Sequence, residues 1–114
     1  MKVLIILNDP PYGTERSYNG LRLAKAVSKE NSEVTIFLMA DAVNGAKRGQ
    51  KVPQGFYSIE LMLKAVLRKG EVLACSACMD ARGLTDEELI DGIRRSTMQE
   101  LAERTLSADK VLVF

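Results

Sequence analysis

Apolar and polar positions along the chain follow two patterns. Short runs rich in Val, Ile and Leu are typical of strands buried on both faces of a parallel sheet. Longer segments with an apolar residue every three or four positions are typical of helices with one buried face. The short runs predict four strands, at residues 2–7, 33–39, 71–75 and 111–114.

The helical pattern fills the segments between these strands. It predicts a first helix that is capped by Thr14 and ends at Asn31-Ser32, a short helix over 41–46, and the clearest helix over 56–69. Three more helices are predicted in the second half of the chain: a short one after Cys75, another over 85–90, and a last one that opens at Ser96. The last helix should bury Met98, Leu101, Ala102 and Leu106. A polar loop with two glycines covers residues 47–55.

Strands that alternate with helices predict one α/β domain over residues 1–114, a three-layer sandwich with a mostly parallel sheet. In such a sheet the functional crevice lies outside the carboxyl ends of the strands. Three segments follow strand ends and should meet there: residues 8–14, 40–42 and 75–78.

Both cysteines of the chain, Cys75 and Cys78, fall at one of these strand ends. The apolar run before Cys75 and the short helix after it place the first sulfur at a helix start. Free N–H groups there favour an anion, so we expect a lowered pKa for the Cys75 thiol. The Arg82 side chain would add to this effect if it folds back toward Cys75.

Other interpretations of the cysteine pair remain open. Free cysteine is often a buried packing residue, and both thiols are candidates for that role. Cys78 lies about one turn after Cys75, so it is either a partner thiol that forms a disulfide with Cys75 or inert packing. Thioredoxin-like exchange is disfavoured, because that fold carries its C-x-x-C motif after the first strand.

Composition narrows the function further. A net charge of +1 gives no whole-surface attraction for nucleic acid or an anionic membrane, and no apolar run approaches the roughly 20 residues of a membrane helix. Two cysteines and no signal-like segment indicate the reducing cytoplasm. The absence of His excludes Cys-His and Ser-His catalytic pairs, and two sulfurs supply only half of a zinc site. We therefore expect no metal, no cofactor and no direct binding of nucleic acid.

A few polar residues near the strand ends have both a functional and a structural interpretation. Tyr12, Gly13 and Thr14 either form an anion-binding pocket at a helix start or a plain turn and cap. Asp41 either lines the crevice or caps the short helix that follows it. The basic residues of the polar loop either steer a partner or are simply solvated.

Three stretches together carry a resemblance to a known family. They are Pro11-Tyr12-Gly13-Thr14 after the first strand, residues 37–43 with Gly49-Gln50 behind them, and Cys75 followed by Arg82-Gly83, with residues 108–111 leading into the last strand. In this order they resemble the DsrE/DsrF-like sulfur-relay family, which includes small subunits that pass sulfur toward tRNA thiolation.

The resemblance implies a small α/β fold, a homo-oligomer such as a trimer or hexamer, and sulfur donor and acceptor proteins as partners. It also implies that Cys75, with Arg82-Gly83 at the family's offset, carries persulfide sulfur, so that an active protein would be a sulfurtransferase or sulfur carrier. The alternative is a non-catalytic assembly subunit of the same fold, or one that binds a small ligand at the strand ends.

Overall fold

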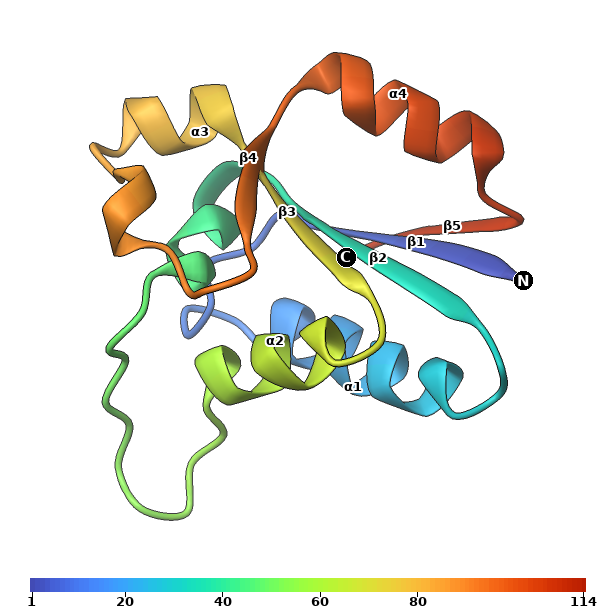
Figure 1. The fold of residues 1–114 in the computed structure, drawn as a ribbon. Coiled ribbons are helices and arrows are strands. Elements are labelled where there is room, and N and C mark those ends of the chain that lie inside the picture. Colours follow the sequence, from blue (N-terminus) through green and yellow to red (C-terminus); the bar gives the residue numbers. More distant parts are fainter.

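The computed structural model describes all residues from 1 to 114 and contains one five-stranded sheet (Figure 1). Every strand runs parallel to its neighbours, in the order β4-β3-β2-β1-β5. The strands are β1 (Lys2–Leu7), β2 (Glu33–Leu38), β3 (Glu71–Cys75), β4 (Arg94–Ser96) and β5 (Lys110–Val113). The predicted α/β class and parallel sheet are confirmed.

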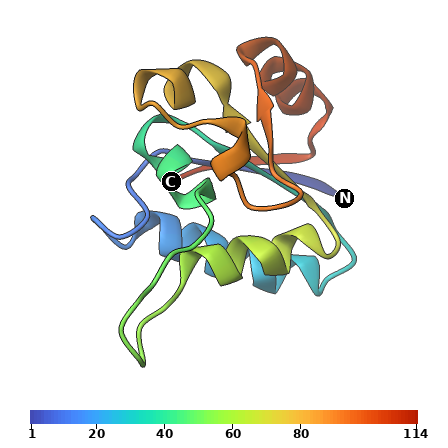
Figure 2. The same cartoon turned by 60° about the vertical axis from the view of Figure 1, so that its left-hand side comes forward.

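Helices cover both faces of this sheet. The four α-helices are α1 (Arg16–Ser28), α2 (Ile59–Leu67), α3 (Ser76–Ala81) and α4 (Met98–Ser107), and two 3-10 helices are η1 (Ala40–Ala46) and η2 (Asp86–Glu88). Helices α1 and α2 lie side by side below the sheet, and α3 and α4 lie above it (Figures 1 and 2). This arrangement is the predicted three-layer sandwich.

The core lies where the strand centres meet the helices. Ile5, Ile36 and Leu73 are fully buried, as the continuous apolar runs predict. At Gly70, a Cβ would overlap the carbonyl oxygen of Val34. The chain can therefore enter β3 beside β2 only because this position has no side chain.

Strand β4 was not predicted from the sequence. Its three residues, Arg94, Arg95 and Ser96, are polar and too few to show an alternating pattern. They become a strand because they pair with β3, where Cys75 is opposite Ser96. The strand that ends in Cys75 is therefore an inner strand, between β2 and β4.

The predicted starts of α1 and α2 are wrong. The first helix begins at Arg16, and Thr14 donates its hydroxyl to Asp9 Oδ2 at 2.6 Å in the turn before it. The clearest helix begins at Ile59 and not at Phe56, because the Ser58 hydroxyl accepts the Leu61 N–H as its cap.

The last helix also differs from its prediction. Its cap is Thr97, whose hydroxyl accepts the Glu100 N–H at 3.2 Å, while Ser96 belongs to β4. Only Leu101 of the four predicted core residues is buried; Met98, Ala102 and Leu106 are exposed. Helix α4 thus keeps an apolar surface that nothing in this chain covers.

One long connection stands out from the sandwich. Residues 47–58 run outward and back as an extended loop between η1 and α2 (Figures 1 and 2). Phe56 lies in this loop with 68% of its surface exposed. None of the helices has the length and apolar character that a bilayer-spanning segment requires.

Candidate functional site at the cysteine pair

Cys75 occupies the junction between β3 and α3. It is the last residue of the strand and the N-cap of the helix, and its Sγ accepts the Cys78 N–H at 3.4 Å. The pairing of β3 with β4 ends at this residue, which lies opposite Ser96, and the Cys75 sulfur caps the helix that begins at Ser76. The predicted strand–helix junction is confirmed.

The environment of Cys75 works against ionisation. Only 8% of the residue is exposed, and this burial raises the pKa of the thiol above its ordinary value. The neighbouring Cys78 side chain raises it further, whereas the N–H groups of Cys78 and Ala77 lower it. The expectation of a lowered pKa is wrong, because desolvation outweighs the helix-start N–H groups.

Cys78 connects α3 to the end of β2. It is half-buried, and its Sγ accepts the backbone N–H of Ala40 at 3.2 Å. Ala40 has a φ of +49°, a left-handed conformation that non-glycine residues rarely adopt. The segments 40–42 and 75–78 therefore meet at the carboxyl ends of the strands, as predicted.

Arg82 and Asp41 form an ion pair across these two segments. Arg82 Nε donates to Asp41 Oδ1 at 2.8 Å, Nη2 lies 2.8 Å from the same oxygen, and Nη1 donates to the Cys78 carbonyl at 3.0 Å. The Arg82 guanidinium thus bonds to Asp41 and to the backbone of α3. It does not fold back onto the Cys75 sulfur.

The segment that contains Tyr12, Gly13 and Thr14 turns toward the long loop. The Tyr12 hydroxyl donates to the Gln50 side chain and accepts the Ile59 N–H at 3.0 Å. Thr14 bonds to Asp9, and a Cβ on Gly13 would crowd the Pro10 ring. These contacts account for the three residues within the fold, and none of them bonds to the cysteine segments.

Sequence reasoning missed Arg95, which comes from the unpredicted strand β4. Its Nη1 donates to both oxygens of Ser76, the first residue of α3, and pairs with Asp80 at 2.9 Å; its Nε pairs with Asp86. This side chain holds α3 in place beside the Cys75 sulfur. Only the adjacent Arg94-Arg95 pair ahead of a helix cap signals it in the sequence.

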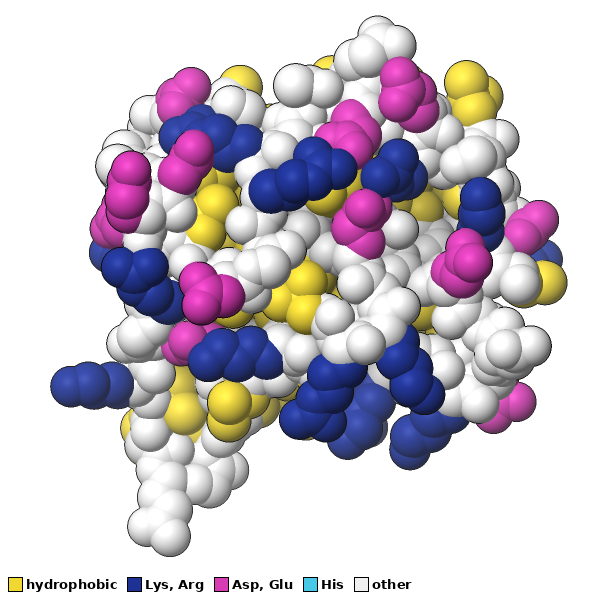
Figure 3. All heavy atoms as spheres, in the orientation of Figure 1, with side chains coloured by type: hydrophobic (Ala, Val, Ile, Leu, Met, Phe, Trp, Pro, Cys, Tyr) yellow, Lys and Arg dark blue, Asp and Glu magenta, His cyan; other side chains and the backbone are white.

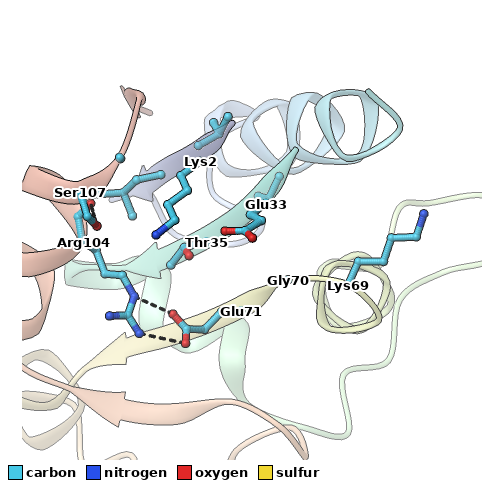
Figure 4. A pocket seen from close by; sticks show the side chains of 12 residues that line it. Lys2, Glu33, Thr35, Lys69, Gly70, Glu71, Arg104 and Ser107 are labelled. Atoms are coloured by element: carbon cyan, nitrogen blue, oxygen red, sulfur yellow. Dashed lines mark hydrogen bonds and ion pairs between the residues drawn. The ribbon is translucent and has the colours of Figure 1, made fainter. Parts of the chain in front are cut away.

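A separate cavity of about 370 Å³ lies at the other end of the sheet, beneath α4 (Figure 4). It opens at the amino ends of β1, β2 and β3, where Arg104 of α4 donates to both carboxylate oxygens of Glu71, at 2.9 and 3.0 Å. The Arg104 and Glu71 side chains in this cavity therefore pair with each other, and neither is left free for a ligand. No group of three or more metal-ligating side chains gathers anywhere in the chain.

Comparison with known proteins gives consistent results. The DsrE/DsrF-like family model matches residues 1–114. Protein YchN of Escherichia coli K12 is 45% identical over 116 residues, covering 99% of this chain and 98% of that protein. The crystal structure of the ychN protein superposes with a TM-score of 0.95 at 44% identity and covers 100% of this chain and 99% of its own.

A more distant relative carries a different name. The "Protein TusC homolog" of Aliivibrio fischeri is 21% identical over 112 residues, covering 96% of this chain and 95% of that protein. The matches extend over the strands, the cysteine junction and the helices alike. The chain is therefore a member of the DsrE/DsrF-like family.

Proposed function

We propose that this protein is a sulfur-relay protein in which Cys75 accepts and passes on persulfide sulfur. Membership of the DsrE/DsrF-like family and the similarity to a TusC homolog support a role in sulfur relay. The observation that carries the assignment to Cys75 is its place as the N-cap of α3, at the carboxyl edge of a parallel sheet.

The transfer has two steps. The Cys75 thiolate attacks the terminal sulfur of a donor persulfide, the new S–S bond forms on Cys75, and the donor thiolate leaves. An acceptor thiolate then attacks that terminal sulfur, and Cys75 leaves as thiolate. A raised pKa reduces the thiolate fraction at neutral pH but makes each thiolate a stronger nucleophile.

Because Cys75 is buried, the first step depends on how the sulfur donor docks. With 8% of Cys75 exposed, a donor must bring its sulfur directly to the junction between α3 and η1. The N–H groups of Cys78 and Ala77 are already directed at the Cys75 sulfur and stabilise negative charge there. The Cys78 sulfur accepts the Ala40 N–H, so this hydrogen bond would have to break before Cys78 could form a disulfide with Cys75.

An exposed apolar surface supports a homo-oligomer, and we propose a trimer or hexamer. Leu106 of α4 is 87% exposed and Val113 of β5 is 63% exposed, with Met98 and Val111 also exposed on these elements. Strand β5 is an edge of the sheet. Exposed apolar side chains on an edge strand and its neighbouring helix are typical of contacts between subunits. Two free cysteines fit the cytoplasm as the compartment.

The buried sulfur also favours a second candidate, a non-catalytic assembly subunit with the same fold. One experiment separates the two. The wild type, Cys75→Ser and Cys78→Ser are incubated with a sulfane-sulfur donor and their intact masses are measured. A sulfur adduct that is lost only in Cys75→Ser supports the relay, whereas the absence of an adduct on Cys75 in the wild type rejects it in favour of the assembly subunit.

A further inference from the structure

A groove of about 800 Å³ lies between α1 and α2. These two helices cover the face of the sheet opposite α3 and α4 (Figures 1 and 2). Its inner end reaches Val34 and Gly70, at the amino ends of β2 and β3. Cys75 lies at the carboxyl end of β3, beneath α3. The groove is therefore separate from the cysteine site, and a partner bound in it would not depend on sulfur chemistry.

The charged side chains that line this groove are all cationic. Arg22, Lys25 and Lys29 come from α1 and the segment just after it, and Arg68 and Lys69 follow α2; the lining contains no Asp or Glu. All five side chains are exposed, and none takes part in an ion pair. Figure 3 shows Lys and Arg side chains gathered below the sheet, over α1 and α2.

Nothing on the two helices neutralises this charge. Helix α1 contains no acidic residue. The one acidic residue of α2, Glu60, accepts the Gln50 N–H at 2.9 Å and lies 3.3 Å from Lys64, so it is turned away from the groove. In a chain with a net charge of only +1, five unpaired cations on one groove form a local surface that favours an anionic partner.

The same groove also offers apolar surface. Leu61, Met62, Ala65 and Val66 of α2 line it, and Leu61 is exposed at its edge. An apolar wall with a cationic rim matches a helix that has apolar residues on one face and carboxylates beside them. A simple inorganic anion would make no use of the apolar wall.

Nucleic acid and lipid fit this groove less well. The ring of Tyr18 stacks on Tyr57 with 4.1 Å between centroids, and the Arg22 guanidinium lies over it at 5.5 Å. Tyr57 also stacks on Tyr12. The aromatic rings are thus engaged with one another and leave no free platform for a base. A bilayer surface would contact Leu61 at the edge of the groove but would leave the half-buried Met62, Ala65 and Val66 unused.

We propose that the groove between α1 and α2 docks an acidic amphipathic helix of a partner protein. The probe for a test is a fluorescein-labelled peptide of about 16 residues, long enough to follow α1 at roughly 1.5 Å per residue. Leu residues are placed at helical spacing, with Glu residues on both sides of them. A peptide of the same composition in scrambled order and a labelled single-stranded RNA of similar length complete the set.

Fluorescence anisotropy at low ionic strength measures binding to the wild type and the variants. The groove variant Arg22→Glu/Lys25→Glu/Arg68→Glu should weaken binding of the amphipathic peptide by at least about tenfold, because three attractive charge pairs at the rim become repulsive. Leu61→Ser should weaken the same peptide with little effect on the scrambled one, because it removes apolar surface only.

The matched control reverses three cations elsewhere that are also exposed and unpaired, as Arg48→Glu/Lys51→Glu/Lys110→Glu. It has the same net charge as the groove variant and should retain wild-type affinity. Circular dichroism checks that all variants are folded. Equal weakening in both triple variants, or no binding of the amphipathic peptide to the wild type, overturns the proposal. Tighter binding of the RNA than of the peptide, lost in the groove variant, overturns it in favour of nucleic acid.

Discussion

The backbone N–H of Ala40 donates a hydrogen bond to the Sγ of Cys78 at 3.2 Å. This contact connects the end of β2 to α3 across two segments that are 38 residues apart in sequence. Ala40 takes a left-handed conformation, with φ at +49°, where it makes this bond. The second cysteine of the C-x-x-C motif therefore has a structural role of its own, whether or not it also takes part in sulfur chemistry.

Removing the Cys78 acceptor should lower stability. Cys78→Ala leaves the Ala40 N–H without its partner, which we expect to cost about 1 kcal/mol of unfolding free energy, as is typical for a half-buried hydrogen bond. Cys78→Ser keeps an acceptor at the position and should lose less. Urea unfolding monitored by circular dichroism measures both. Equal losses in the two variants would contradict a role for this bond.

The reactivity of Cys75 should depend on pH in a way that reflects its burial. Because burial raises the pKa of the thiol, the rate of its alkylation by iodoacetamide should keep rising with pH beyond about 8.5, the pKa of a free cysteine, before it levels off. The rate is measured in Cys78→Ser, so that a single thiol reacts, and a cysteine-containing peptide is the control. A rate that levels off below the peptide's pKa would contradict the raised value.

The same shift affects stability. A thiol whose pKa is raised in the folded state contributes stability that is fully present below the pKa of the unfolded thiol. That contribution is lost as the pH rises through the folded value. The wild type should therefore lose more stability than Cys75→Ser on going from neutral to alkaline pH, as measured by urea unfolding at each pH.

Glu100 should make the protein sensitive to acid. Hydrogen bonds from Arg94 and Ser96 lower the pKa of its carboxyl group to about 2, and Arg104 pairs with it at 3.3 Å. A depressed pKa contributes stability above the unfolded value of about 4.3, and this stability is lost as the pH falls toward 2. Glu100→Gln should flatten that part of the stability curve. An unchanged acid limb in the variant would show that other carboxylates dominate it.

The oligomer should depend on the apolar surface of α4 and β5. Leu106→Glu/Val113→Glu places charges on the two most exposed apolar side chains of this surface and should shift the protein toward monomer in light scattering. Phe56→Glu is a control for one added charge on an exposed apolar side chain, since Phe56 is similarly exposed but lies in the long loop. A stable wild-type monomer at micromolar concentration, or dissociation by the control alone, would contradict the proposal.

Patterns within short segments were enough to predict most of the fold. The Val- and Ile-rich runs gave β1, β2, β3 and β5, because strands buried on both faces must be apolar throughout. The position of Cys75 at a strand–helix junction, and its meeting with the segment after β2, followed from the parallel arrangement. The cap of η2 was likewise visible in the sequence, and the Glu88 carboxylate accepts the Thr85 N–H at 2.9 Å.

Contacts between distant segments decided the rest. Arg94 to Ser96 form a strand only because β3 offers an unpaired edge, so no local pattern marks them. The pKa of Cys75 depends on how much of the surrounding chain removes water from its sulfur, and this desolvation outweighs the N–H groups that the sequence could place. Arg82 is drawn to Asp41, its partner from 41 residues away, and not to the sulfur. The sequence by itself determined where the sulfur lies in the fold. The tertiary structure alone decided how strongly that sulfur resists ionisation, because desolvation and ion pairing depend on which distant residues surround it.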